Sequence, residues 1–458
     1  MRRSVNVILA GVGGQRVRPL GMGAAVILAL VLAVVPNHLA AQDVRDLHAE
    51  IDRRAAEVSG DVVAWRRDIH QNPELGNREF RTAGIVAEHL RSLGLDEVRT
   101  DIAHTGVVGV LRGARPGPVV GLRADMDALP VTELADVPFA STVITEYNGQ
   151  EVGVMHACGH DVHTAALMGT ASVLAGMRED LPGTVVFLFQ PAEEGAPAGE
   201  EGGAELMIAE GAVVEPRPDA YFGLHTSPFP TGLIGWRQGG IMASADEFTI
   251  TVIGRQTHGA APEMGVDPIV VASQIVLALQ TIPSRQVAAT QPVVVSVGKI
   301  EGGVRFNIIP ETVKLDGTIR THDSAVQDDV HARIRRTAES IAESAGATAE
   351  VEIRRFYPVT YNDLELTAAS LSSLRSVVGE QGLVQIPPLM VAEDFSFFAQ
   401  QAPGFYFMLG VNAPGVAFGE AASNHSPYFF VNEDALEIGV RAMAMLAMDY
   451  LEQGAEEE

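Results

Sequence analysis

The sequence predicts an α/β protein, with a three-layer main domain on a mostly parallel central sheet and an inserted ferredoxin-like α+β domain. Two observations lead to this prediction. Short apolar runs rich in Val, Ile, Leu and Phe alternate with segments of helical periodicity from residue 58 to residue 239, a pattern typical of a parallel sheet covered by helices. Between residues 240 and 358 the order changes to β-α-β-β-α-β, which is the ferredoxin-like arrangement.

The elements of the main domain follow from periodicity and from turn residues. Helices are predicted over 43–71, 78–93 and 163–177, and strands over 105–113, 117–129, 184–190 and 219–225. Parallel strands end at one edge of their sheet, and α/β proteins bind ligands there. Polar residues occur where these strands end, namely Asp125, Asp127, Glu193, Glu194 and His225. We therefore expect a functional site at this edge.

The inserted domain follows from a change of pattern near Gly239. Its predicted segments are a strand over 246–254, a helix over 267–282, strands over 291–303 and 311–321, a helix over 324–346 and a strand over 348–358. The main domain resumes after this segment with helices around an apolar strand at 405–410. The expected boundaries are therefore 42–239 and 359–458 for the two parts of the main domain and 240–358 for the insertion.

The first 41 residues differ in composition from the rest of the chain. Four arginines precede an unbroken apolar stretch over residues 22–35, and small residues follow up to Ala41. This pattern predicts a signal peptide over residues 1–41, and hence a secreted or periplasmic protein. An uncleaved anchor is the alternative, although the apolar stretch is short for a membrane span.

Acidic residues outnumber basic ones by 58 to 32, which gives a net charge of −26. The predicted signal peptide holds four arginines and no acids, so its removal would change the charge to −26 − 4 = −30. Such a surface repels nucleic acids and anionic membranes. We therefore expect neither nucleic acids nor membranes as partners. The one exception is the leader, which would attach the protein to a membrane if it were not cleaved.

The chain has one cysteine, Cys158, in the histidine-rich stretch MHACGHDVH. A lone cysteine in an exported protein has no internal disulfide partner, so it is a buried apolar residue, a nucleophile or a metal ligand. His160 is two residues away, and thiolate and imidazole are ligands that zinc and similar metals favour. The residues expected to converge on a metal site are Cys158, His160, Glu193, Glu194, His225 and His425.

Several segments resemble, in the same order, the motifs of the amidohydrolase branch of the metallopeptidases. This branch includes aminoacylases, hippurate hydrolases and indole-acetyl-amino-acid hydrolases. The segments are WRRDIHQNPELGNREFRT, GLRADMDALP, MHACGHDVHTAALMG, FLFQPAEEG, FGLHTSP, GRQTHGAAPEMGVDPI, FNIIPETVKLDGTIRT, VAEDFSFF and NHSPYF. The resemblance implies a catalytic main domain, an inserted lid domain that forms a homodimer, and two divalent metal ions (Zn, Mn, Ni or Co).

The resemblance also implies roles for individual residues. The implied metal ligands are Cys158, His160, Glu194, His225 and His425, with the Cys158 thiolate bridging both ions. Glu193 corresponds to the general base, which takes a proton from the attacking water and delivers it to the departing amine. Asp125 corresponds to a carboxylate behind the ligands.

Three further positions belong to the implied lid. His258 corresponds to a histidine that reaches the active site of a partner subunit. Asn307 and Arg320 correspond to positions that hold the substrate, and a guanidinium suits the free carboxylate of an N-acyl amino acid.

Two departures from the family pattern concern the choice of acyl group. Glu263 replaces a second histidine, and the loop EEGAPAGEEGGAELM is longer than expected.

The predicted function is metal-dependent hydrolysis of the amide bond of N-acyl amino acids or related peptide-like amides. Alternatives on the same scaffold are an N-acetyl-diaminopimelate-type deacetylase and a dipeptidase. A non-catalytic binding protein and a cysteine-nucleophile hydrolase are alternatives of other classes. The presence of Glu193 argues against the binding protein, because binding alone needs no general base.

Overall fold

The computed structural model describes residues 22–413, 415–416 and 419–457. The chain divides into two compact units, Met1–Glu50 and Ile51–Glu458. Helix α1 (Met22–Gln71) continues across residue 41, where the predicted signal peptide ends, and residues 1–21 of that peptide lie outside the described part. Among the described residues, no helix combines the length and the apolar character needed to cross a membrane.

The larger sheet has eight strands in the order β1-β2-β6-β3-β7-β18-β8-β17. The strands are β1 (Glu97–Ile102), β2 (Gly106–Arg112), β6 (Pro182–Gln190), β3 (Arg115–Asp125), β7 (Ala220–Pro230), β18 (Gly404–Asn412), β8 (Ile234–Trp236) and β17 (Leu383–Gln385). The four central strands, β6, β3, β7 and β18, are mutually parallel, as are β8 and β17. The predicted α/β class with a mostly parallel central sheet is confirmed.

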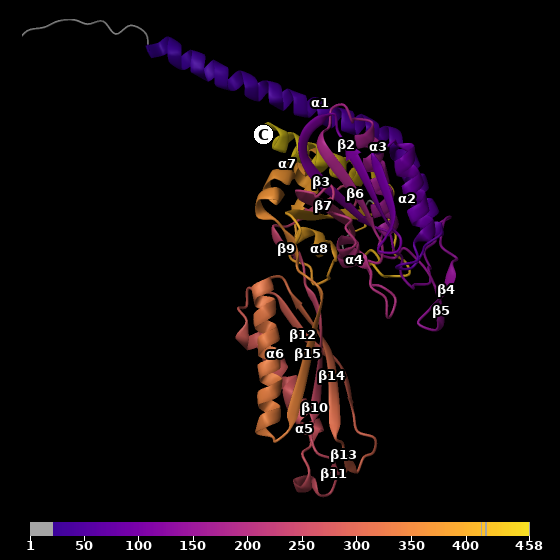
Figure 1. Cartoon of the computed structure of the whole chain (residues 1–458), viewed down its shortest axis with the longest axis vertical. Coiled ribbons are helices and arrows are strands. Elements are labelled where there is room, and N and C mark those ends of the chain that lie inside the picture. The colour runs from indigo at the N-terminus through magenta and orange to yellow at the C-terminus, as the bar shows by residue number, and fades with distance from the viewer. Residues whose placement is uncertain (1–21, 414, 417–418, 458) are drawn as a thin grey trace, which may run out of the picture. The chain divides into compact units, whose positions relative to one another are not determined.

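Helices cover both faces of this sheet, which gives the three layers (Figure 1). One face packs against α3 (His160–Ala175) and α9 (Asp434–Glu457), and α2 (Phe80–Ser92) and α7 (Leu364–Gly382) lie beside them. The other face packs against α4 (Gly203–Ala209) and α8 (Phe395–Ala399). Alternate side chains of each buried strand serve the two faces, so the strands are apolar along their whole length.

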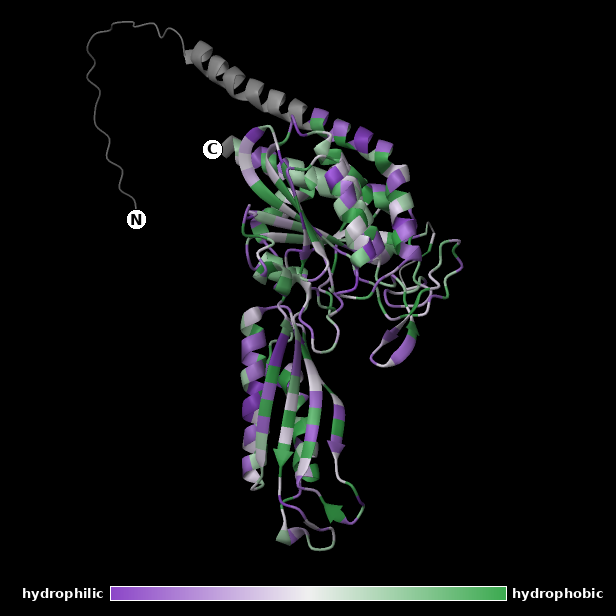
Figure 2. Cartoon of the chain, turned by 45° about the vertical axis from the view of Figure 1, so that its right-hand side comes forward, coloured by the Kyte–Doolittle hydropathy of each residue, from purple (hydrophilic) through white to green (hydrophobic). Residues whose placement is uncertain are grey.

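A second sheet is built by residues 245–357 and has four antiparallel strands in the order β12-β14-β10-β15. In chain order its elements are β10 (Ala245–Ile253), α5 (Pro268–Leu279), β12 (Val293–Gly302), β14 (Thr312–Thr321), α6 (Ser324–Ser344) and β15 (Thr348–Tyr357). This is the predicted β-α-β-β-α-β order. Figure 2 shows hydrophobic and hydrophilic residues alternating along these strands. The apolar set, including Phe248, Ile250 and Val252 of β10, forms a separate core with α5 and α6.

Three two-stranded ribbons complete the described strands. They pair β4 (Ile144–Tyr147) with β5 (Gln150–Gly153), β11 (Thr257–His258) with β13 (Ile308–Ile309), and β9 (Gly239–Met242) with β16 (Thr360–Asn362). The β9–β16 ribbon brings together the two segments that flank the second sheet in the sequence.

Candidate metal centre

The turn before α3 presents two of the predicted ligands. Gly159 is the N-cap of α3 and has a left-handed backbone conformation, with φ of 94°. A Cβ atom on this residue would lie 2.3 Å from Thr226 Oγ1, so only glycine fits here. The sharp turn allows Cys158, just before it, and His160, just after it, to face one centre.

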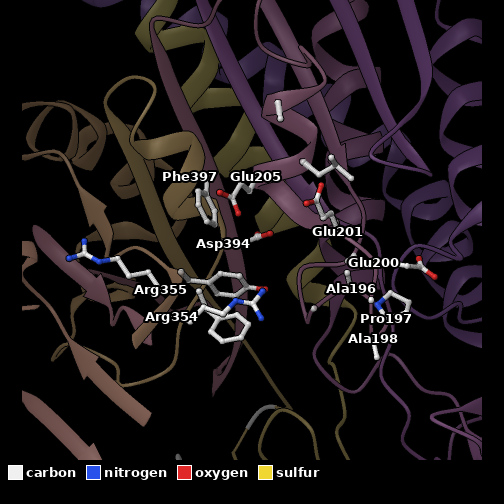
Figure 3. A pocket seen from close by; sticks show the side chains of 18 residues that line it. Ala196, Pro197, Ala198, Glu200, Glu201, Glu205, Arg354, Arg355, Asp394 and Phe397 are labelled. Carbon is white, nitrogen blue, oxygen red and sulfur yellow. The ribbon is translucent and has the colours of Figure 1, made fainter. Parts of the chain in front are cut away.

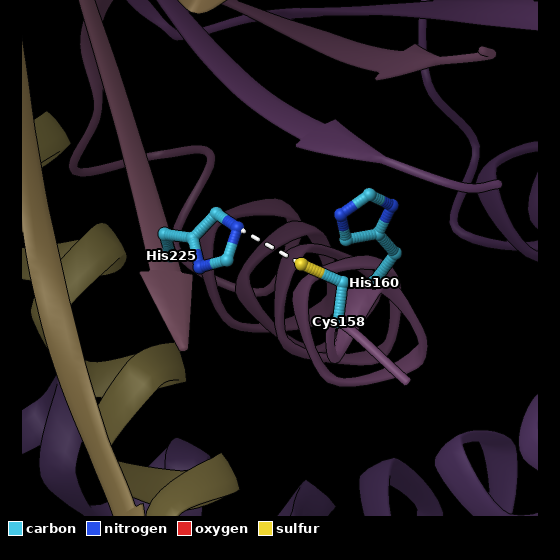
Figure 4. Close-up of side chains that lie close together, drawn as sticks. All are labelled: Cys158, His160 and His225. Carbon is cyan, nitrogen blue, oxygen red and sulfur yellow. Dashed lines mark hydrogen bonds between the residues drawn. The ribbon is translucent and has the colours of Figure 1, made fainter. Parts of the chain in front are cut away.

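The side chains of the five predicted ligands form two groups that share Cys158. In one group, Cys158, His160 and His225 place ligand atoms within 4.8 Å of one another. Figure 4 shows these three side chains close together. In the other, Cys158, Glu194 and His425 do the same. The Cys158 sulfur lies 3.4 Å from His225 Nε2 and 3.3 Å from His425 Nε2. A shared thiolate between two clusters of donors is suited to bridging two cations.

The backbone around Cys158 is held from two sides. Thr226 Oγ1 and Asn424 Nδ2 both donate hydrogen bonds to the Cys158 carbonyl, at 2.7 and 3.0 Å. His425 N donates to the carbonyl of Ala157 at 2.8 Å. The φ of His425 is 68°, a conformation that non-glycine residues rarely adopt. The surrounding hydrogen bonds therefore hold a strained backbone that aims the imidazole at the sulfur.

The charges within the cluster favour the thiolate. Burial alone would raise the pKa of the Cys158 thiol, but the imidazoles of His225 and His160 lower it to about 6. Burial lowers the pKa of His225, and the neighbouring thiolate outweighs this and raises it to about 9. The Cys158 thiolate and the His225 imidazolium therefore stabilise each other.

The donor set also fits a divalent cation. His160 Nδ1 lies 3.1 Å from Asp127 Oδ1, so this nitrogen carries the proton and donates it. His160 Nε2 is buried and has no hydrogen-bond partner among the described residues. A buried nitrogen lone pair without a partner is costly, and a metal ion would satisfy it. Sulfur, imidazole and carboxylate together are typical ligands of zinc and similar metals.

Glu193 is positioned beside these donors but has a different environment. It is 6% exposed, and its Oε2 lies 3.9 Å from His160 Nε2. Burial, with the nearby carboxylates of Glu393 and Glu194, raises its pKa well above the usual range. The Tyr357 hydroxyl donates a hydrogen bond of 2.6 Å to the Glu193 carbonyl. Glu193 is therefore a carboxylate with a high proton affinity, as a general base requires.

Two carboxylates at the end of β3 have different partners. Asp127 contacts the site directly, because it accepts from His160 Nδ1 and from the backbone N–H of Glu194 at 2.9 Å. Asp125 instead accepts from His163 Nδ1 at 2.5 Å and lies 3.8 Å from His160 Nε2. The sequence placed both aspartates at a strand end but assigned a role only to Asp125. The signal for Asp127 was its place two residues after Asp125, directly beyond the carboxyl end of the strand.

His163 is not available as a ligand, although it lies in the same motif. The backbone N–H of Thr226 donates to His163 Nε2 at 2.8 Å, so that nitrogen is the acceptor. The proton is therefore on Nδ1, which donates to Asp125. Both ring nitrogens are used, and the residue links α3 to β7.

A buried ionic network lies behind Glu193. The guanidinium of Arg123 is fully buried and contacts the carboxylates of Asp125, Glu393 and Asp394 at 2.7, 2.9 and 2.8 Å. Tyr406 donates its hydroxyl to Glu393 at 2.7 Å. Sequence reasoning missed Arg123 and Glu393, because their pairing joins segments 270 residues apart in this α/β fold. The network fixes the acidic wall that raises the proton affinity of Glu193.

The three predicted lid residues lie apart from this cluster. His258 is in β11 and Asn307 lies just before β13, and the Gly259 N–H donates to the Asn307 carbonyl at 2.8 Å. Arg320, in β14, donates to the carbonyl of Ile319 at 2.9 Å and also contacts the Thr318 hydroxyl. Among the described residues, no hydrogen bond or ion pair joins any of the three to the five ligands.

Comparison with known proteins identifies the family. The model of peptidase family M20/M25/M40 matches residues 121–449. The chain belongs to this family. It is therefore a metal-dependent hydrolase that acts on amide bonds. The matched residues contain β6, β7, β8, β17 and β18 of the larger sheet and the whole second sheet, whereas β1 and β2 precede them.

Relatives and a solved structure support this over nearly the whole chain. The chain is 41% identical to thermostable carboxypeptidase 2 of Saccharolobus solfataricus, over 88% of this chain and 99% of that protein. It is 36% identical to N-acetylcysteine deacetylase of Bacillus subtilis, over 85% and 97%. A dinuclear metal-binding peptidase of the same family from Bacillus subtilis matches with a TM-score of 0.73 and 33% identity, covering 87% of this chain and 99% of that one.

Two cavities flank the Glu193–Glu194 pair of this hydrolase. The larger, of about 640 Å³, is lined by the loop over residues 195–202 and by Arg354–Tyr357 of β15 (Figure 3). The smaller, of about 250 Å³, is lined by Glu194 itself and by Asp127. Gly195 and Pro197 line both cavities, so the long loop noted in the sequence separates them.

Proposed function

We propose that this protein hydrolyses the amide bond of N-acyl amino acids with two divalent cations. The observation that carries this proposal is the shared thiolate of Cys158 between two groups of ligand atoms. Two relatives support the substrate class, because N-acetylcysteine is an N-acyl amino acid and a carboxypeptidase releases an amino acid with a free carboxylate. The similarity to a dinuclear metal-binding peptidase supports the number of cations.

In this proposal the ligands divide between the two cations. His160 and His225 would hold one, Glu194 and His425 would hold the other, and the Cys158 thiolate, which both groups share, would serve both. Zn, Mn, Ni and Co all suit this donor set. When bound, such cations supply the positive charge that activates water and polarises the scissile carbonyl.

Residues of the chain then transfer the proton of the attacking water and keep the site oriented. Glu193 accepts the proton of the attacking water at a carboxylate oxygen, because its pKa is raised and its position beside His160 Nε2 faces the reacting centre. The same carboxyl delivers the proton to the departing amine nitrogen. Asp127 keeps the His160 ring oriented throughout, through the hydrogen bond to Nδ1.

The lid residues take part through a dimer in this proposal. Residues 240–358 form the lid, His258 reaches the site of a partner subunit, Asn307 contacts the substrate, and Arg320 binds its carboxylate. Strand β12 is an edge strand of its sheet. Apolar side chains are exposed on β12, the loop after it and α5, namely Ile300, Val304, Phe306, Leu277 and Val270. A second copy of the chain would cover these side chains.

We further propose that the protein is exported by its leader, residues 1–41. The basic start and the apolar stretch of the leader support this. Sequencing the N-terminus of the protein recovered from the periplasm or the medium tests it. A mature chain that starts near residue 42 is expected, and a full-length chain retained in the cytoplasm would contradict it.

The enzymatic proposal is tested with the purified protein, loaded in turn with each metal. N-acetyl and N-benzoyl amino acids are assayed with and without a chelator, beside Glu193→Gln and the control Glu88→Gln, which is exposed on α2. We expect hydrolysis by the parent and the control, and a loss of about 10²- to 10⁴-fold in kcat for Glu193→Gln. Activity that survives both the chelator and Glu193→Gln would overturn the mechanism. No turnover of any amide at full metal content would overturn the function.

A further inference from the structure

The smaller cavity beside Glu194 has the position of a substrate subsite. Its lining includes Asp127 and Glu194 together with Leu75, Leu129 and Tyr147. Glu194 is a ligand in the proposed metal centre, so a group bound here lies next to the reacting carbonyl. We propose that this cavity binds the acyl group of the substrate and that Tyr147 selects the acyl group by size, an inference that rests on the proposed function.

The size of the cavity suits half of a small substrate. Its volume of about 250 Å³ lies below the roughly 300 to 1,000 Å³ of pockets that enclose a whole drug-sized ligand. The space is sufficient for one substituent of the amide, such as an aromatic ring, and the rest of the substrate extends beyond it. The larger cavity on the other side of the loop provides room for the second half.

The charges decide which half enters the smaller cavity. The amine half of an N-acyl amino acid carries a free carboxylate, and this would meet the carboxylates of Asp127 and Glu146, which both line the cavity. The cavity has one guanidinium, that of Arg78, and it is already paired with Glu200 at 2.6 Å. Leu75, Leu129 and Tyr147 offer apolar surface instead. An uncharged acyl group therefore fits, and the carboxylate-bearing half does not.

The wall next to the long loop is built by specific hydrogen bonds. Asn77 is fully buried, has a left-handed φ of 60°, and donates to Glu200 and to the Glu201 carbonyl at 3.1 and 3.0 Å. Arg78 adds its ion pair with Glu200, and these contacts lower the pKa of the Glu200 carboxyl to about 2. The loop thus stays attached to the main domain, and its Gly195 and Pro197 remain in place as a wall.

A hairpin also contributes to the lining of this cavity, and its turn fixes Tyr147. Asn148 and Gly149 separate β4 from β5, and their φ values are 52° and 75°. Two consecutive positive φ values define a tight type I′ turn, for which Asn-Gly is the preferred sequence. Tyr147 is the residue directly before this turn and is 38% exposed. The turn therefore sets the reach of the phenol ring over the cavity.

The test compares acyl groups on one amino acid. The ratio of kcat/KM for N-benzoyl to N-acetyl substrates is measured for the parent, Tyr147→Ala, Tyr147→Phe and Ile144→Ala. Ile144 lies on the same hairpin, is 64% exposed and does not line the cavity. We expect Tyr147→Ala to change this ratio by about tenfold or more, as apolar pocket contacts do, while the other two variants keep the parent ratio.

Several outcomes would overturn the inference. An active Tyr147→Ala with the parent ratio removes the role of Tyr147, and an equal change in Ile144→Ala assigns the effect to the hairpin as a whole. A change of preference among amino acids with the acetyl group held constant would place the amine half in this cavity. If the parent protein hydrolyses no N-acyl amino acid at all, the proposed function fails first, and this assignment fails with it.

Discussion

Cys158 shows how one residue depends on its neighbours for its chemistry. Burial raises the pKa of a thiol, and the adjacent imidazoles reverse this and lower it to about 6. A serine hydroxyl in the same place would stay protonated, because its pKa is far higher than that of a thiol. The surroundings of the sulfur therefore stabilise a negative charge that a thiol can carry and a serine hydroxyl cannot.

We expect Cys158→Ser to lose metal and activity together. Without the bridging thiolate, both groups of ligands lose a donor, so metal content should fall below that of the parent and activity by about a hundredfold or more. Elemental analysis of the purified variant, beside its rate of hydrolysis, checks this. Glu193→Gln is the matched control, because it should lose activity and keep its metal. Full activity of Cys158→Ser would contradict the bridging role.

In the proposed metal centre Asp127 acts through His160, and its replacement should show this. Asn at this position can still accept from His160 Nδ1, but it no longer provides the negative charge that makes the imidazole more basic. We expect Asp127→Asn to bind its metal about 10- to 100-fold more weakly. Competition with a coloured chelator measures this. The exposed Asp136→Asn should bind like the parent, and equal affinities for both variants would rule out the role.

The limits of sequence reasoning at this scale are geometric. The spacing in MHACGHDVH identified Cys158 and His160, and the strand ends identified Glu193, Glu194 and His225. Arg123 could not be assigned, because its contacts with Glu393 and Asp394 depend on which remote segment closes over the sheet. The partner of His163 could not be predicted either. Several carboxylates lie near this motif, and only the structure shows that His163 Nδ1 points at Asp125.

At the scale of elements, a buried carboxyl connects α2 to the site. Glu79 precedes α2 and is fully buried, and it accepts from Thr105 Oγ1 at 2.6 Å and from the Ala192 N–H at 2.9 Å. Burial and the charge of Asp127 raise its pKa to about 8. Ala192 directly precedes Glu193 in the chain, so this contact holds the start of the Glu193–Glu194 turn.

We expect Glu79 to make the protein less stable as the pH rises. The folded state keeps the Glu79 proton up to a pKa of about 8, whereas the unfolded state loses it at the ordinary value of 4.5. The stability that this proton provides is complete below 4.5 and is lost as the pH rises towards 8. Over this range the loss is roughly 5 kcal/mol at most.

Urea unfolding of Glu79→Gln between pH 5 and pH 8 checks this expectation. The variant needs no proton at this position, so its free energy of unfolding should rise relative to the parent as the pH increases. Glu88→Gln, which is exposed on the same helix, is the control and should keep a constant difference from the parent. A constant difference for Glu79→Gln as well would show that the carboxyl is already ionised in the folded protein.

The order of elements was largely predictable, and the small elements were not. Apolar runs and turn residues predicted the central strands and the β-α-β-β-α-β segment, because burial on both faces leaves a clear pattern. Strands β8 and β17 have three residues each, too few for any periodicity. Their pairing exists only because β18 and the end of α7 bring them together. The composition of the sequence changes at residue 41, but helix α1 continues across it, because the residues before and after this point both favour helix.

At the scale of the whole molecule, the exposed apolar residues of the second sheet predict an assembly. We expect Leu277→Arg, at a side chain that is 72% exposed on α5, to turn a dimer into a monomer. A charge buried in an apolar interface without a partner is costly. Sedimentation velocity measures the mass. Activity should fall while metal content stays unchanged, because His258 would no longer reach a neighbouring site.

Val214→Arg is the matched control for this experiment. Val214 is 69% exposed and lies in the main domain, away from α5 and β12. The control should keep the mass and the activity of the parent. A parent protein that is already monomeric and active would contradict the dimer and the role of His258.

The single thiol also determines how this protein would be inactivated by oxidation. A thiolate that has lost its cations is open to oxidation, and a sulfenic acid is normally rescued by a second cysteine that forms a disulfide. This chain has no second cysteine. Without a partner thiol in the chain, oxidation that begins at Cys158 can proceed to the sulfinic acid, which only a dedicated repair enzyme reverses, and to the sulfonic acid, which is irreversible. Loss of metal would thus be the first step of an irreversible chemical decay.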